Sequence, residues 1–129
     1  PPVSLRVLSW TEDVAALMQS AAVLVTKPGG LTTAEAATCA VPVVMFDAIP
    51  GPERRNAARI AEAGAGVLTK GARATAEAVL SLLRDERLRI RMSACAKALA
   101  RPEAAERIAA LILKEPLSMR EAMTGRMMA

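Results

Sequence analysis

A short glycine-rich turn carries the residues whose types could bind an anion. The segment Thr26-Lys-Pro-Gly-Gly-Leu-Thr-Thr-Ala-Glu35 follows an apolar run at residues 23–25. Because Gly29 and Gly30 lack a Cβ, backbone N–H groups there could approach a phosphate closely. A helix that begins at this turn would also direct the positive end of its dipole toward the phosphate. The segment therefore predicts a phosphate site at the end of a strand.

The same residues have a second interpretation, in which nothing external is bound. The spacing Thr32-x-x-Glu35 is that of a capping box, where the glutamate turns back to the helix start. Thr32 or Thr33 would then be the N-cap. The segment has neither a G-x-G-x-x-G pattern nor a G-K-[ST] ending. The residues alone leave both interpretations open.

Strands and helices alternate around this turn. The hydrophobic pattern predicts strands at 5–10, 23–25, 41–46 and 67–69, and helices from Thr11 to about 21, at 33–39 and from about 57 to 63. Right-handed crossovers make such strands parallel. The loops at 27–32 and 47–56 then leave the same carboxyl edge, where ligands of open α/β sheets bind. We expect an α/β, Rossmann-like three-layer domain with a parallel sheet and a helical C-terminal region.

Composition narrows the chemistry that this chain can perform. Its 129 residues suit one domain, and 2% aromatic residues argue against nucleic-acid binding by base stacking. With no histidine, a histidine general base or triad is excluded within the chain. No acidic or cysteine cluster has metal-ligand spacing, so we expect no metal. Two cysteines far apart in sequence point to reduced thiols and the cytoplasm.

The charge balance leaves membrane contact open. A net charge of +4 would suit an anionic ligand or an anionic membrane surface. Arg84, Arg87 and Arg91 are expected on one helix face, which is either solvated or in peripheral contact with a membrane.

The remaining polar residues converge on the predicted carboxyl edge. Glycine N–H groups could hold phosphate, and Glu35 could accept hydrogen bonds from vicinal hydroxyls. Glu53 and Asn56, in the second loop, could bind a polyol. Together these groups suit a nucleotide sugar.

Three motifs at this spacing resemble the C-terminal half of one glycosyltransferase family. They are Thr26-Lys-Pro-Gly-Gly-Leu-Thr-Thr-Ala-Glu-Ala36, Ile49-Pro-Gly-Pro-Glu-Arg-Arg-Asn-Ala57 and Ala63-Gly-Ala-Gly66. The family includes monogalactosyldiacylglycerol synthases, processive diacylglycerol glucosyltransferases and the N-acetylglucosaminyl transferase that makes the lipid-linked peptidoglycan precursor. The resemblance covers residues 5–67. It implies the glycosyltransferase-B arrangement, in which two Rossmann-like domains face a cleft and the C-terminal domain binds the UDP-sugar.

Carried over residue by residue, the resemblance assigns the first loop to the nucleotide. Gly29, Gly30, Leu31 and Thr32 would surround the diphosphate. Glu35 would accept hydrogen bonds from the ribose hydroxyls.

The resemblance assigns the other site residues to the two ends of the donor. Trp10 and Thr11 would border the uracil, although Trp10 also suits a core anchor. Glu53 and Asn56 would lie near the donor hexose. Family members usually have glutamine where this chain has Pro52, and proline cannot donate a hydrogen bond to a sugar hydroxyl.

The resemblance also implies a reaction. A hexose would move from a UDP-sugar to a lipid acceptor with inversion, and without metal or other cofactor. The general base and acceptor site would belong to an N-terminal domain that this chain lacks, so residues 1–129 alone should be inactive. Residues 1–70 would form the nucleotide-sugar-binding core and residues 71–129 its helical completion. The enzyme would work in the cytoplasm, with the inner face of the membrane as the place where it meets its acceptor.

Other functions remain compatible with the sequence. The chain could be a separately encoded donor subunit or a non-catalytic nucleotide-binding module. A UDP-sugar epimerase shares the two-domain architecture, although epimerases usually carry histidine in this half.

Overall fold

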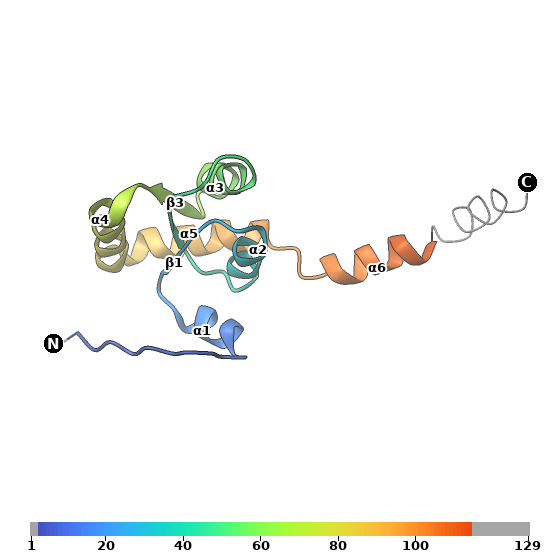
Figure 1. Cartoon of the computed structure of the whole chain (residues 1–129), viewed down its shortest axis with the longest axis horizontal. Helices are drawn as coiled ribbons and strands as arrows, with labels where there is room; N and C mark the ends of the chain where they lie inside the picture. Colours follow the sequence, from blue (N-terminus) through green and yellow to red (C-terminus); the bar gives the residue numbers. More distant parts are fainter. Residues whose placement is uncertain (1–2, 115–129) are drawn as a thin grey trace, which may run out of the picture.

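The computed structural model describes residues 3–114 of the chain (Figure 1). In this part, helices and strands alternate through residue 84 and helices follow. The elements are α1 (Val14–Ser20), β1 (Leu24–Thr26), α2 (Gly30–Thr38), β2 (Val43–Phe46), α3 (Pro52–Glu62), β3 (Gly66–Thr69), α4 (Gly71–Arg84), α5 (Glu86–Leu99) and α6 (Ala104–Lys114).

The strands form a parallel sheet with β2 at its centre. The strand order is β1-β2-β3, and both pairs are parallel. Val43, Val44 and Met45 are at most 2% exposed, because a central parallel strand is covered on both faces. The expected sequence of parallel strands from residue 23 to residue 69 is confirmed.

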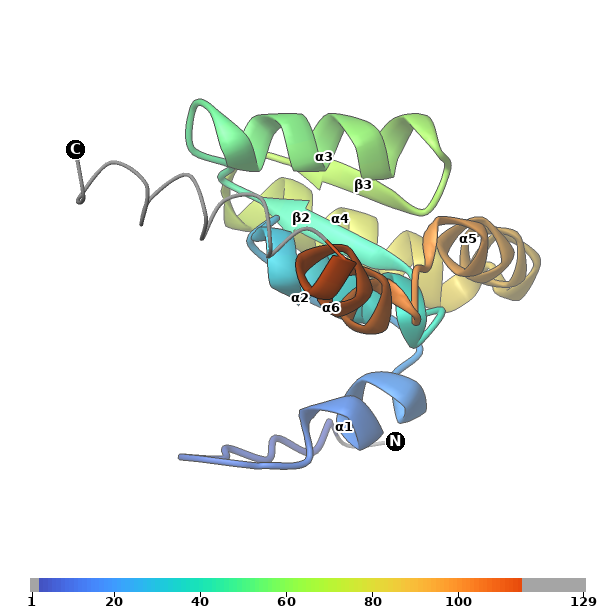
Figure 2. The same cartoon turned by 90° about the vertical axis from the view of Figure 1, so that its right-hand side faces the viewer.

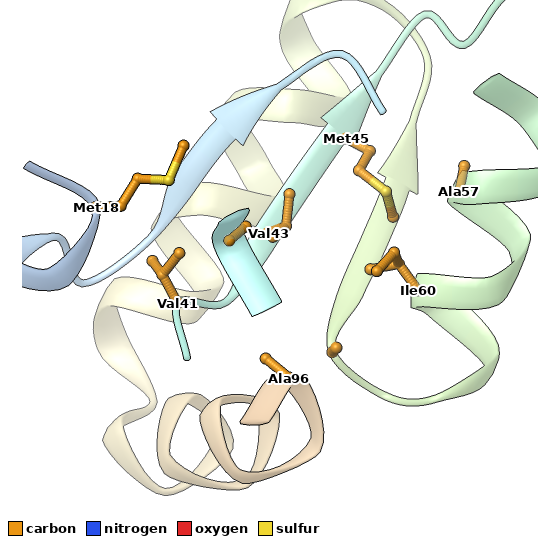
Figure 3. Packing of buried hydrophobic residues seen from close by; sticks show 9 residues of the cluster. Met18, Val41, Val43, Met45, Ala57, Ile60 and Ala96 are labelled. Atoms are coloured by element: carbon orange, nitrogen blue, oxygen red, sulfur yellow. The ribbon is translucent and has the colours of Figure 1, made fainter. Parts of the chain in front are cut away.

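Helices cover both faces of the sheet, which gives three layers. Val43 and Met45 pack on one face with Ala57 and Ile60 of α3 and with residues of α2 and α5 (Figure 3). Val44, which points the other way, packs in a second cluster with residues of α4 and α5. The two views in Figures 1 and 2 show α3 and α4 on opposite sides of the sheet. The predicted α/β fold class is confirmed.

The predicted strand at residues 5–10 is wrong. This segment pairs with no strand in the described part of the chain, and Val3, Leu5 and Val7 are 98%, 87% and 82% exposed. The sheet in this part of the chain consists of β1, β2 and β3, and residues 5–10 do not lie beside either edge strand in a hydrogen-bonded register. An alternating apolar pattern predicts a strand only where a neighbouring strand can pair with its backbone groups.

Several predicted helix boundaries also differ. Helix α1 begins at Val14, and Thr11 instead accepts a hydrogen bond at its Oγ1 from the N–H of Asp13 (3.1 Å). Helix α3 begins at Pro52, so the predicted loop at 47–56 is shorter. Gly51 makes this early start possible, since its φ of 97° is a conformation that favours glycine.

The three arginines expected on one helix face lie on two helices. Asp85 separates α4 from α5 and accepts a hydrogen bond from the N–H of Leu88 (2.9 Å), which makes it the N-cap of α5. Arg84 ends α4, whereas Arg87 and Arg91 belong to α5. Within residues 3–114, no helix is both long and apolar enough to span a bilayer. The part of the predicted helical completion at 115–129 lies outside the described residues.

Candidate functional site

The glycine turn after β1 directs its carbonyl oxygens toward the protein. Four successive carbonyls accept hydrogen bonds. The donors are the Gly29 N–H to Lys27 O (2.9 Å), Asn56 Nδ2 to Pro28 O (3.0 Å), Thr33 N–H and Oγ1 to Gly29 O (3.0 and 2.9 Å), and Thr33 Oγ1 to Gly30 O (3.1 Å). With the carbonyls engaged, the partial negative charges of the turn are held away from its open side.

The amides that follow are free to bind a ligand. The N–H groups of Gly30, Leu31 and Thr32 have no hydrogen-bond partner among residues 3–114, because their acceptors in a longer helix would precede α2. Leu31 is 82% exposed, so the amides lie at the surface. Three free amides at the positive end of a helix dipole can bind an anion such as a diphosphate.

The packing of the protein does not itself require glycine in this turn. Neither Gly29 nor Gly30 has a positive φ. An added Cβ would meet the Thr32 Oγ1 at 3.9 Å and the Asn56 Nδ2 at 3.8 Å, which are ordinary contacts. Contacts within the protein therefore do not explain glycine at these two positions, whereas close approach of a ligand would.

We therefore expect Gly30→Ala to separate stability from binding. The variant should be as stable as the parent or up to about 1 kcal/mol more stable, because alanine favours the helix. Its Cβ should weaken binding of a diphosphate such as UDP, by about tenfold. Thermal unfolding and calorimetric titration check the two effects. A large loss of stability would show that the glycine is structural.

The capping-box interpretation of Thr32 and Glu35 is wrong. The N-cap of α2 is Gly29, and no side chain caps the helix. Thr33 bonds the turn carbonyls instead. Glu35 is exposed, and its carboxylate makes no hydrogen bond within residues 3–114, so it is available to an external donor.

The second loop is joined to the first through α3. Glu53 is half-buried, and its Oε2 accepts a hydrogen bond from the N–H of Ile49 (3.0 Å). Asn56, one turn further on, reaches Pro28 in the glycine turn. Pro52 is exposed at the start of α3. The structure thus brings Asn56 to the glycine turn and uses Glu53 to hold the loop before α3.

Two predicted site residues lie on the segment outside the layered body. Trp10 is 83% exposed, so it is not a core anchor here. Residues 3–13 run apart from the sheet in both views (Figures 1 and 2), and neither Trp10 nor Thr11 bonds the glycine turn in the described part of the chain.

Residues that the sequence did not single out also support the carboxyl edge. Asp47 follows β2 with a φ of 43°, and its Oδ1 accepts a hydrogen bond from the N–H of Gly71 (3.2 Å). Thr69 donates to Met45 O (3.0 Å) and pairs with the hydroxyl of Thr75 (2.8 Å). These bonds fix the ends of β2 and β3 to the start of α4. For Asp47, the signal in the sequence is an aspartate that directly follows a predicted strand. No residue pattern indicates the two threonines.

The parallel sheet with helices on both faces and short crossovers defines a Rossmann-like α/β domain. Residues 4–99 match the family of glycosyl transferases group 1, and the chain belongs to this family. The resemblance inferred from the motifs is thereby confirmed.

Individual relatives agree with this assignment. The chain is 33% identical over 114 residues to the processive diacylglycerol beta-glucosyltransferases of Bacillus thuringiensis (strain Al Hakam) and Bacillus cereus (strain Q1). The match covers 88% of this chain and 29% of each relative. The crystal structure of Acinetobacter baumannii MurG superposes with a TM-score of 0.74 at 25% identity, covering 84% of this chain and 33% of MurG. The chain thus spans about a third or less of the proteins it matches.

Proposed function

We propose that this chain is the donor-binding part of an inverting, metal-independent glycosyltransferase that moves a hexose from a UDP-sugar to a lipid acceptor. The observation that carries the proposal is the turn at residues 27–32, with its carbonyls engaged and its three following amides free. Membership in the glycosyl transferases group 1 supports the reaction class. The names of the diacylglycerol glucosyltransferases support a lipid acceptor and a hexose.

The nucleotide lies along the start of α2 in this proposal. The amides of Gly30, Leu31 and Thr32 bind the diphosphate beside Gly29. Glu35 lies three residues beyond Thr32, or about 4.5 Å along the helix axis, and its free carboxylate accepts from the ribose hydroxyls. A carboxylate suits this role because vicinal hydroxyls are donors and a charged acceptor strengthens each bond.

The hexose lies toward the start of α3. One oxygen of Glu53 is engaged with Ile49, and its second oxygen is the group that we assign to a hexose hydroxyl. Pro52 offers no donor, so this contact depends more on Glu53 here than in relatives with glutamine at that place. Trp10 and Thr11 are proposed to border the uracil through the turn that precedes α1.

The rest of the reaction belongs to parts of the enzyme outside this chain. We assign the general base and the lipid acceptor site to an N-terminal domain, and the reaction to the cytoplasmic face of the membrane. Residues 1–70 serve as the nucleotide-sugar-binding core and residues 71–129 as its helical completion. Transfer from a UDP-hexose to diacylglycerol should therefore require the longer protein. Turnover by residues 1–129 alone would contradict this division of roles.

Glu35→Gln tests the ribose assignment. The amide keeps one acceptor oxygen but loses the charge, and hydrogen bonds to charged groups contribute about 1.5–3 kcal/mol. We expect the Kd for UDP, measured by calorimetry, to rise about tenfold or more. The melting temperature should change little, since Glu35 is exposed and its carboxylate makes no hydrogen bond within residues 3–114.

A matched variant separates this effect from a general change of charge. Glu62→Gln removes an exposed carboxylate near the end of α3, and its Kd for UDP should equal that of the parent. Equal affinities of the Glu35→Gln variant and the parent would contradict the ribose role.

A further inference from the structure

The orientation of one peptide group decides which way the glycine turn faces. The Gly29 N–H donates to Lys27 O (2.9 Å), which closes a three-residue γ-turn centred on Pro28. The Pro28 ring is fully buried, so its position is fixed. The carbonyl of Pro28 points toward α3.

Backbone sterics do not secure this orientation. Gly29 has a φ of −65°, but glycine adopts positive φ values almost as readily. Rotation of the Pro28–Gly29 peptide would therefore meet little steric resistance at Gly29. The carbonyl oxygen would leave the α3 side of the turn and bring its partial negative charge to the opposite side.

Besides the bond from the Gly29 N–H to Lys27 O within the turn, Asn56 supplies the bond from outside the turn that opposes this rotation. Its Nδ2 donates to Pro28 O at 3.0 Å, and no other residue in the described part of the chain donates to that oxygen. Asn56 is half-buried on the second turn of α3, where its backbone is helical and its side chain is held between two elements. The same amide nitrogen lies 3.8 Å from the Cβ position of Gly30, so it borders the turn directly.

We propose that Asn56 is a positioning residue that locks the Pro28–Gly29 peptide in the orientation that keeps carbonyl charge away from the diphosphate. This inference rests on the proposed donor site. It gives Asn56 a role in holding the glycine turn, in addition to the expected contact with the hexose. The lock also couples α3, which carries Glu53, to the start of α2.

The test replaces Asn56 by leucine, which has a similar size and no donor, in the longer enzyme that contains this chain. Two ligands are titrated by calorimetry: UDP, which carries the diphosphate, and uridine, which does not. We expect the Kd for UDP to rise about tenfold, the equivalent of one lost hydrogen bond. The Kd for uridine should stay the same, and Glu62→Gln should leave both values at those of the parent.

Amide hydrogen exchange provides a readout that needs no ligand. In Asn56→Leu, exchange of the Gly29 and Thr33 amides, which are hydrogen-bonded at the turn, should become faster, while exchange in β2 stays unchanged. An unchanged exchange rate at these two amides, or a parallel loss of UDP and uridine affinity, would overturn the lock. If the parent enzyme binds UDP no better than uridine, the proposed donor site fails, and the exchange measurement alone decides whether Asn56 holds the turn.

Discussion

Thr32→Asp should weaken UDP binding strongly while making the protein slightly more stable. A carboxylate in the first turn of α2 interacts favourably with the helix dipole, by about 0.3–1 kcal/mol. The same carboxylate would lie beside a diphosphate bound at the free amides of Gly30, Leu31 and Thr32. Two like charges about 4 Å apart near a protein surface repel by about 4 kcal/mol. We therefore expect the Kd for UDP to rise at least about 100-fold.

Thr38→Asp is the matched control at the other end of the same helix. Thr38 is exposed and is the last residue of α2. A carboxylate there opposes the helix dipole, so stability should fall by about 0.3–1 kcal/mol. UDP affinity should stay close to that of the parent. Chemical denaturation and calorimetry measure the two quantities, and UDP binding that survives in Thr32→Asp would place the diphosphate elsewhere.

Gly66→Ala should give the largest loss of stability in this domain. Gly66 begins β3, and an added Cβ would lie 2.6 Å from the Val43 carbonyl oxygen and 2.9 Å from Ile60 Cγ2. The Val43 oxygen belongs to the backbone of the central strand, so it cannot move without disturbing the sheet. Overpacking in a core typically costs about 1–3 kcal/mol and occasionally more. We expect about 3 kcal/mol, which lowers the melting temperature by about 10 °C or more.

Gly30→Ala serves as the control for this substitution, because the added Cβ has room at that position. Thermal unfolding of the two variants should differ in sign: a large decrease for Gly66→Ala, and no change or a small increase for Gly30→Ala. If Gly66→Ala unfolds within about 1 °C of the parent, the close packing between β2, β3 and α3 is not as the structure shows.

The central layer of this fold could be predicted from residue patterns. Residues 41–46 are apolar and include three valines, which is typical of a buried parallel strand, and β2 lies there with Val43, Val44 and Met45 buried. Gly64, with a φ of 76°, lies just after the end of α3, as its residue type indicates. These features depend on a few neighbouring residues each, so local patterns are enough to predict them.

The segment at residues 5–10 could not be predicted in the same way. Its alternation of apolar residues is that of a strand, but a strand also needs a hydrogen-bonding neighbour. The neighbour is a property of strand order, and strand order depends on the whole sheet. Periodicity within six residues therefore cannot decide whether the segment pairs.

The bonds within the candidate site could not be predicted from the sequence. Residue types and spacing predict Gly29, Gly30 and Glu35 as site residues, which stays a prediction. The bond from Asn56 to Pro28 joins residues 28 positions apart, and no local pattern reports such a contact. The start of α2 at Gly30 was missed because two threonines offered a more usual N-cap.

The most direct test of the donor-site account is a calorimetric titration of the protein with UDP, ADP and inorganic pyrophosphate, alongside the Glu35→Gln variant. The account predicts that UDP binds most tightly and that Glu35→Gln loses most of this preference. Equal affinity for all three ligands, or no binding by folded protein, would contradict a nucleotide-specific donor site at the start of α2.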